Sequence, residues 1–209
     1  MMKIDDVLTL APVIPVLTID EVAHARPIAE ALVAGGLRAL EVTLRTPVAI
    51  EAIREMSQIE GAVVGAGTVL SEADLAAGLE AGALFVVSPG LTPRLVEKAI
   101  RLGVPFLPGI QTASDIMRGL DLGLSRFKFF PAIAAGGIPA LKALSAPFRQ
   151  CRFCPTGGIT QATAADWLAL DAVPCVGGSW LVSPGRPDWQ TISALARRAR
   201  NLMPVSPHA

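Results

Sequence analysis

Residues 38 to 45 read RALEVTLR, a short stretch in which apolar and polar side chains alternate. Successive side chains of an extended strand point to opposite faces, so Leu40, Val42 and Leu44 share one face. Glu41, Thr43 and Arg45 share the other. The apolar face suits packing against helices. The stretch therefore predicts a strand whose second face turns Glu41 and Arg45 toward the interior of a larger assembly of strands.

Seven further short apolar runs recur along the chain, with amphipathic helical patterns between them, several closed by glycine. The runs are residues 12–18, 62–68, 84–90, 105–110, 126–131, 152–158 and 174–179. Continuous apolar strands that alternate with helices favour a parallel sheet covered on its outside. Eight such units are the number that closes a barrel. The sequence therefore predicts an α/β protein, a single (β/α)₈ TIM barrel domain over residues 1–209.

Two details refine this fold. A doubly wound open sheet is the competing topology, but it normally shows a glycine fingerprint after its first strand, and PVIPVLTID at 12–20 has none. The segment KIDDVLTL at 3–10 predicts a short extra N-terminal helix across the bottom of the barrel.

Composition excludes several classes of protein. With 52% hydrophobic and 17% charged residues, the chain can bury a sizeable core. Its 18 basic residues balance 18 acidic ones without a dense basic run, so a nucleic acid or an anionic membrane is not the expected partner. The chain has no apolar stretch long enough to span a membrane, and its N-terminus lacks the basic region of a signal peptide. We expect a soluble cytoplasmic protein that acts on a small molecule.

The cysteines and histidines do not indicate a metal or redox site. Cys151 and Cys154 have the spacing CRFC, but on a strand these two side chains point to opposite faces and are too far apart for a disulfide. Cys175 is the only other cysteine, and neither His24 nor His208 sits in a motif. We therefore predict that the cysteines pack in the core.

Lys128 lies in RFKFFP, residues 126–131, where alternation places it on the inner face with Phe130. A buried pair of Lys128 and Glu41 seldom stabilises a protein relative to apolar residues of the same volume, so its presence indicates chemistry. An apolar pocket disfavours the ammonium form and favours the neutral amine that forms a Schiff base. The other lysines, at positions 3, 98 and 142, lie near the terminus or on amphipathic helical patterns.

Two glycine pairs follow the last two predicted strands, in TGGI at 156–159 and VGGSW at 176–180. Barrels often hold a phosphate at these two loops, where backbone N–H groups approach the anion and the helices that follow add favourable dipoles. Ser179 can donate a further hydrogen bond. Arg45 suits a carboxylate, and Thr68 and the turn at 88–90 occupy the adjacent rim. Together these features predict a lyase for a phosphorylated 2-keto acid.

The stretches ALEVTLRT, VGAGTVL, VSPGLTP, PFLPGI, FKFFPA, FCPTGGI and VGGSWLV follow one another along nearly the whole predicted barrel. In this order they resemble the 2-keto-3-deoxy-6-phosphogluconate (KDPG) aldolase family, class I aldolases of the Entner–Doudoroff pathway whose relatives also cleave 4-hydroxy-2-oxoglutarate (KHG). The stretches SPGRPDW at 183–189 and NLMPVSPHA at 201–209 depart from the family's pattern.

The resemblance implies a homotrimeric barrel that cleaves KDPG to pyruvate and D-glyceraldehyde 3-phosphate without a metal or a cofactor. Matching positions give Lys128 as the Schiff-base lysine and Glu41 as the acid and base. The family's other sites fall on Arg45 and Thr68 for the carboxylate, on Pro89 and Phe130 as pocket lining, and on Gly157, Gly158, Gly178 and Ser179 for the phosphate.

Three alternatives to this function are open on the residues alone. The chain can be an aldolase that prefers KHG or the galactonate epimer of the phosphorylated substrate, since a single stereocentre leaves no mark on these motifs. A metal-dependent lyase needs ligands that the sequence lacks. A non-catalytic barrel that binds a sugar phosphate needs the glycine loops but not an inward Lys128 that faces Glu41.

Overall fold

The computed structural model describes residues 2–183, 185 and 187–202. Its strands are β1 Val13–Leu17, β2 Ala39–Thr43, β3 Val63–Gly67, β4 Phe85–Val87, β5 Phe106–Leu107, β6 Gly109–Ile110, β7 Arg126–Phe129, β8 Arg152–Pro155 and β9 Val176–Gly178. Its helices are α1 Ile4–Leu8, α2 Val22–Ala34, α3 Ala49–Ser57, α4 Glu72–Glu80, α5 Pro93–Leu102, α6 Ala113–Asp121, α7 Gly137–Ser145, α8 Ala164–Leu168 and α9 Trp189–Arg200.

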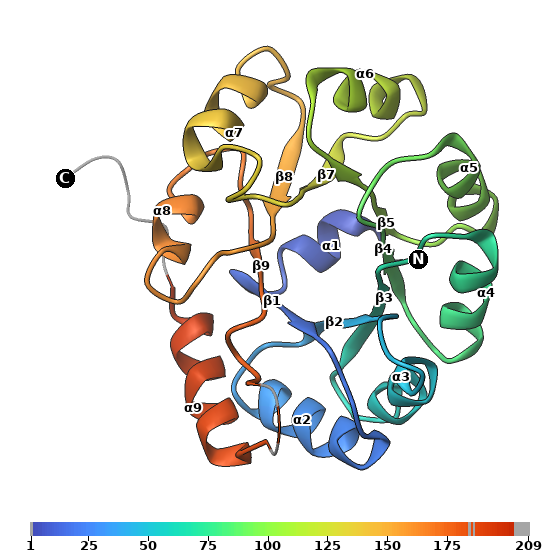
Figure 1. Cartoon of the computed structure of the whole chain (residues 1–209), viewed down its shortest axis with the longest axis vertical. Helices are drawn as coiled ribbons and strands as arrows, with labels where there is room; N and C mark the ends of the chain where they lie inside the picture. The colour runs from blue at the N-terminus through green and yellow to red at the C-terminus, as the bar shows by residue number, and fades with distance from the viewer. Residues whose placement is uncertain (1, 184, 186, 203–209) are drawn as a thin grey trace.

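The strands pair in parallel throughout and form a curled sheet with helices on its outer side (Figure 1). Six strands follow the order β5-β4-β3-β2-β1-β9, and three more follow β6-β7-β8. A parallel bridge between Thr156 and Gly177 joins the end of β8 to β9. Neighbouring strands are consecutive in the chain from β1 to β5, without the reversal of strand order that a doubly wound sheet requires. The described strands therefore do not follow the doubly wound order.

The run PFLPGI was expected to form one strand but forms two. Pro108 lies between β5 and β6, and proline lacks the N–H group that a continuous ladder would use. Its carbonyl oxygen still accepts a hydrogen bond from Lys128 N, at 2.8 Å. The interruption therefore leaves the neighbouring strand β7 in register, with Gly109 opposite Lys128.

The predicted alternation of faces is confirmed. Leu40 and Val42 of β2 lie in the large apolar cluster between strands and helices, together with Phe127 and Phe129 of β7. Glu41 and Lys128 point the other way, into the space that the strands surround. The same alternation thus builds the outer core and places two charged side chains inside.

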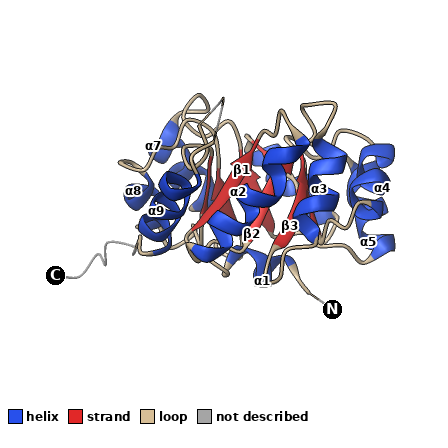
Figure 2. Cartoon of the chain, turned by 90° about the horizontal axis from the view of Figure 1, so that it is seen from below, coloured by secondary structure: helices blue, strands red, loops and turns tan. Residues whose placement is uncertain are grey.

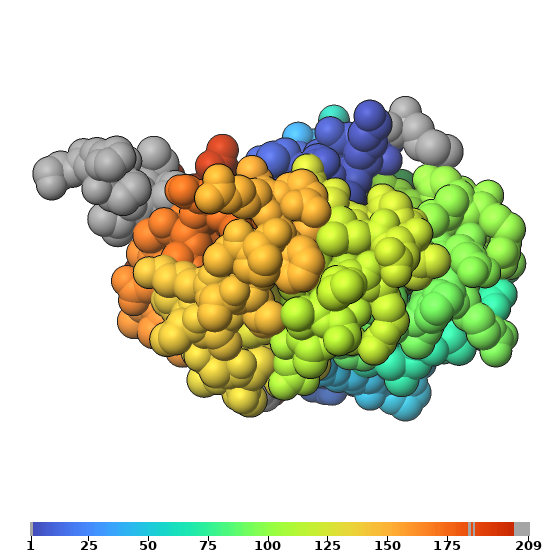
Figure 3. Space-filling model, turned by 90° about the horizontal axis from the view of Figure 1, so that it is seen from above, coloured from blue at the N-terminus to red at the C-terminus, as the bar shows by residue number. Residues whose placement is uncertain are grey.

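The predicted N-terminal helix is confirmed as α1, which closes the end of the molecule where the strands begin (Figures 2 and 3). Val7 and Leu8 are buried and belong to the inner apolar cluster. That cluster also contains Ile14, Ala39, Val63, Phe85, Val87, Leu107, Cys154 and Cys175. The inner space therefore has an apolar floor.

Local signals explain where the outer helices begin and end. Ser71 accepts a hydrogen bond from Asp74 N while Asp74 accepts one from Ser71 N, which is a capping box at the start of α4. Helix α5 has Pro93 in its first turn and ends at Gly103, whose φ of +64° is the left-handed conformation that glycine adopts easily. The predicted glycine closure is therefore present at this helix.

The C-terminal region adds α9, which packs against α2. Ile192, Ala196 and Ala199 are buried, and a β-carbon at Gly35 would overlap the side chain of Ala196. Residues 184, 186 and 203–209, with His208 among them, lie outside the described part of the two departing stretches. Among the described helices, none is both long and apolar enough to cross a membrane.

Candidate active site

Lys128 and Glu41 face each other inside the curled sheet, from β7 and β2. The distance from Lys128 Nζ to Glu41 Oε1 is 2.9 Å, and only 5% of Lys128 and 3% of Glu41 are exposed. They are the only buried charged residues in the described part of the chain. Taking such a pair out of water is costly, and apolar residues of the same volume often stabilise a fold as well. The geometry therefore provides a buried amine beside a carboxylate.

Two neighbours shape the space around the pair. The ring centroid of Phe130 lies 5.4 Å from Lys128 Nζ, which confirms that both side chains share the inner face. Gly67 ends β3 beside Glu41, and a β-carbon there would fall 2.5 Å from Glu41 Oε1. Sequence reasoning missed Gly67, although the glycines of VVGAG in a strand interior signal close approach of another group.

Arg45 lies farther out than expected. Strand β2 ends at Thr43, and Arg45 occupies the turn that follows, with an exposed side chain. The prediction that Arg45 ends the strand is therefore wrong, because β2 stops at Thr43 and the chain turns before the alternation reaches Arg45. No ion pair of its guanidinium with another described residue is present. Arg45 stands at the rim and is available to an anion.

Thr68 occupies the corresponding position after β3. It is half-buried, and its φ of +58° is in the left-handed region, which β-branched residues rarely adopt. The backbone bond from Leu44 N to Gly67 O, 2.8 Å long, holds the ends of β2 and β3 together. A strained rim residue beside Arg45 is the kind of backbone outlier that clusters at functional sites.

The two glycine loops lie side by side at the ends of β8 and β9. The bridge from Thr156 to Gly177 joins them, and the carbonyl of Gly157 accepts a hydrogen bond from Ile133 N at 3.1 Å. Gly157 and Gly158 have φ of +106° and +79°, so the backbone itself requires glycine there. Ser179 is exposed at the end of the second loop.

The expected helix dipoles do not adjoin these loops. Helix α8 begins at Ala164 and α9 at Trp189, several residues beyond the glycines. That prediction is wrong because irregular turns come between each strand and its helix. Packing also explains why residue 178 is glycine, since a β-carbon there would overlap the ring of Trp180. Backbone N–H groups and Ser179 are what the loops offer an anion.

Pro89 lies in the turn after β4, half-buried at the same rim. Ser88 is buried, and its hydroxyl donates a 2.5 Å hydrogen bond to Gly90 O, which closes the turn on itself. Gly109 of β6 packs directly against the backbone of Pro89, where a side chain would not fit. These two contacts hold the turn at 88–90 in place.

The cysteines pack as predicted. All three are buried and free, and Cys154 and Cys175 belong to the inner apolar floor. The contact with Cys154, together with burial, raises the pKa of the Cys175 thiol well above its ordinary value. Burial and the raised pKa therefore make the Cys175 thiol a poor nucleophile. No group of three His, Cys, Asp or Glu side chains suited to a metal ion lies among the described residues.

Comparison with known proteins agrees with this geometry. A family model described as KDPG and KHG aldolase matches residues 4–195. The chain belongs to this aldolase family. It is 58% identical to the 2-dehydro-3-deoxy-phosphogluconate aldolase of Zymomonas mobilis over 199 residues, 95% of this chain and 96% of that protein. The family resemblance of the sequence motifs is thus confirmed.

Two solved structures of family members are similar to this one. The KDPG aldolase of Zymomonas mobilis ZM4 with 3-phosphoglycerate is 56% identical, has a TM-score of 0.95, and 97% of each chain is covered. The KDPG aldolase of Legionella pneumophila, with pyruvate captured as a covalent carbinolamine intermediate, is 44% identical. Its TM-score is 0.92, with 96% of this chain and 99% of that chain covered.

Proposed function

We propose that the chain is a carbon–carbon lyase, a class I aldolase that cleaves KDPG to pyruvate and D-glyceraldehyde 3-phosphate through a Schiff base on Lys128. The buried pair of Lys128 and Glu41, 2.9 Å apart, is the observation that carries this proposal. The Legionella relative, with pyruvate captured as a carbinolamine, supports a covalent mechanism. The Zymomonas structure with 3-phosphoglycerate supports a phosphorylated ligand.

The fold proposed for this enzyme is a single (β/α)₈ TIM barrel over residues 1–209. Strands β5 and β6 count as one barrel strand interrupted at Pro108, and the Thr156–Gly177 bridge brings β8 against β9. Because β9 also pairs with β1, these contacts support a closed ring. The family model, which spans residues 4–195, supports a single domain.

The reaction begins on the ketone carbon C2. The Lys128 ammonium passes a proton to Glu41, and the neutral amine attacks C2 to form a carbinolamine. Glu41 returns its proton to the carbinolamine hydroxyl, which leaves as water and gives an iminium. The iminium accepts the electron pair of the C3–C4 bond as that bond breaks. Glu41, directly or through one water, takes the proton of the C4 hydroxyl. The aldehyde leaves, and an enamine of pyruvate stays on the lysine.

The second half returns the enzyme to its starting state. Glu41 gives a proton to C3 of the enamine, which restores the iminium. Water then adds at C2 and releases pyruvate, which frees the amine of Lys128. The buried position of both groups keeps competing water away from the enamine while it waits for its proton.

The remaining site residues hold the two ends of the substrate. Arg45 and Thr68 bind the carboxylate, for which the exposed guanidinium of Arg45 is free among the described residues. Pro89 and Phe130 line the pocket. The phosphate binds at the two glycine loops, through Gly157, Gly158, Gly178 and Ser179. Binding of the phosphate holds the reacting carbons in place at the other end of the substrate. This interaction is therefore expected to raise kcat as well as affinity.

Steady-state cleavage assays that detect released pyruvate test this function. We expect the highest kcat/KM with KDPG, and a loss of kcat as well as kcat/KM when the phosphate is removed. A higher kcat/KM with KHG or with the galactonate epimer would instead favour those alternatives. Binding of KDPG without any pyruvate release would point to the non-catalytic barrel. Activity that a chelator abolishes would contradict the metal-free mechanism.

Oligomeric state and location stay predictions from the sequence. The family resemblance predicts a homotrimer, and composition predicts a cytoplasmic protein. Sedimentation velocity of the purified protein measures the first directly, with a monomer or dimer as the contradicting result.

A further inference from the structure

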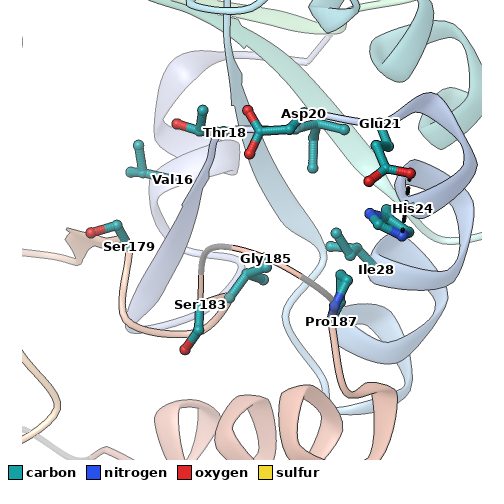
Figure 4. Close-up of a pocket in the computed structure, with 12 residues that line it drawn as sticks. Val16, Thr18, Asp20, Glu21, His24, Ile28, Ser179, Ser183, Gly185 and Pro187 are labelled. Carbon is teal, nitrogen blue, oxygen red and sulfur yellow. Dashed lines mark ion pairs between the residues drawn. The ribbon is translucent and has the colours of Figure 1, made fainter.

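A cavity of about 270 Å³ lies where β1 ends, beside the loop that follows β9 (Figure 4). Its wall includes Val16 and Thr18 from the end of β1, and Ser179. Val16 is the register partner of Glu41 on one side, and Pro15 is the partner of Gly178 on the other. The cavity therefore lies between the strand of the proposed proton-transfer group and the loop proposed for the phosphate.

Thr18 and Thr43 form a hydroxyl pair at this point. Thr43 Oγ1 donates to Leu17 O at 2.9 Å, and this uses the single proton of the Thr43 hydroxyl. Thr18 Oγ1 lies 3.2 Å from Thr43 Oγ1, so Thr18 is the donor in that contact. Thr18 is exposed at the cavity wall. Its lone pairs remain free, which makes Thr18 an oriented hydrogen-bond acceptor.

An oriented acceptor selects the kind of group that binds it. A hydroxyl of the ligand can donate to Thr18, whereas a ketone or an ionised phosphate oxygen cannot. The carboxylates of Asp20 and Glu21 line the cavity on the side of Thr18 away from Ser179 (Figure 4), and they disfavour an anion on that side. His24 lies beside them, with Nε2 at 4.0 Å from Glu21 Oε2. The part of the wall at Thr18 therefore suits a neutral hydroxyl.

We propose that Thr18 is a specificity-determining residue, which accepts a hydrogen bond from the C5 hydroxyl of the substrate. This inference rests on the proposed function. Glu41 serves the C4 hydroxyl and the glycine loops hold the phosphate on C6, so C5 lies between them. In the sheet, β1 likewise lies between β2 and β9. Val16 and Thr18 are thus the β1 side chains that meet the middle of the carbon chain.

The test is condensation of pyruvate with two matched aldehydes. D-Glyceraldehyde 3-phosphate carries the hydroxyl that becomes C5, and 3-oxopropyl phosphate has the same phosphate without that hydroxyl. Thr18→Val keeps the shape of the side chain and removes its oxygen. We expect kcat/KM with D-glyceraldehyde 3-phosphate to fall about tenfold, the value of one neutral hydrogen bond, with little change for 3-oxopropyl phosphate. Thr18→Ser should restore the wild-type preference.

Controls separate this role from a structural one. Ser183 lines the same cavity, and Ser183→Ala should leave both values unchanged. Capture of pyruvate on Lys128 by borohydride, at the wild-type rate, shows that Thr18→Val leaves the reacting end intact. An equal loss with both aldehydes, or no loss with either, would overturn the role of Thr18. A wild-type enzyme that condenses pyruvate with neither aldehyde would instead refute the proposed function.

Discussion

The two ends of the strand assembly use the same strands for different purposes. Where the strands begin, α1 closes the interior, and the inner side chains are apolar, with Ala39 and Phe85 among them. Where the strands end, the interior holds Glu41 and Lys128, and the rim holds Thr68 in a strained conformation. Ala39 and Glu41 lie on one face of the same strand, two residues apart. Along β2, stability and chemistry are therefore assigned to different residues of the same face.

Replacement of the lysine is expected to have the largest effect. Lys128→Met removes the amine, so pyruvate release from KDPG should fall to the uncatalysed background in the coupled assay. It also leaves Glu41 buried without a partner, which should lower the free energy of unfolding by about 3–5 kcal/mol. The double variant Lys128→Met/Glu41→Leu should regain that stability but not turnover. Lys142→Met, on an exposed position of α7, is the control.

Replacement of the acid should have the next largest effect. Glu41→Gln keeps the shape and removes the proton-transfer group, so kcat should fall by about 10²- to 10⁴-fold in steady-state assays. Glu51→Gln on the surface of α3 is the matched control, with unchanged kcat expected. A Glu41→Gln variant with wild-type turnover would assign the proton transfers to another group.

A substitution in the apolar floor should lower stability and leave turnover unchanged. Phe85 is fully buried, and its ring occupies the space beside Gly65, where a β-carbon would overlap it. Phe85→Ala should lower the free energy of unfolding by about 3–5 kcal/mol in urea titrations. At temperatures where the variant is folded, kcat should match the wild type. If kcat fell as steeply as stability, the two ends would not be independent.

The smallest expected effect is a pH dependence of the free energy of unfolding. It arises at Asp115 at the start of α6, away from the floor and from the reacting pair. Burial alone would raise the pKa of Asp115, but hydrogen bonds from Thr112 and the backbone N–H groups at 111 and 112 lower it below its ordinary value of 3.8. A depressed pKa stabilises the fold above the unfolded value, and this stability is lost as pH falls through the folded value. Asp115→Asn should therefore destabilise the protein at pH 7 but not at pH 2, measured by urea unfolding. A difference that persisted at pH 2 would assign the effect to packing.

Much of the fold and the reacting pair could be predicted from periodicity. The alternation in RALEVTLR and RFKFFP is a local property, and it placed Glu41 and Lys128 on the inner face. It failed at Arg45, because the length of a strand depends on where its neighbours stop pairing. It also could not divide the run PFLPGI, where the proline interrupts the ladder.

The rest of the site depends on contacts between distant residues. Gly67 makes room for Glu41 only because β2 and β3 pair with Thr43 opposite Gly67. The hydroxyl pair of Thr18 and Thr43 likewise requires the register of β1 against β2. No spacing in the sequence reveals such a register. The predicted helix starts directly after the glycine loops were wrong for a similar reason. The length of each turn is set by the packing of the following helix on the sheet.

The most direct test of the central claim is borohydride reduction of the intact protein with pyruvate, followed by mass spectrometry and peptide mapping. The account predicts one reduced pyruvate adduct per chain, on the peptide that contains Lys128, and none in Lys128→Met. Absence of an adduct, or an adduct on Lys98 or Lys142, would contradict it.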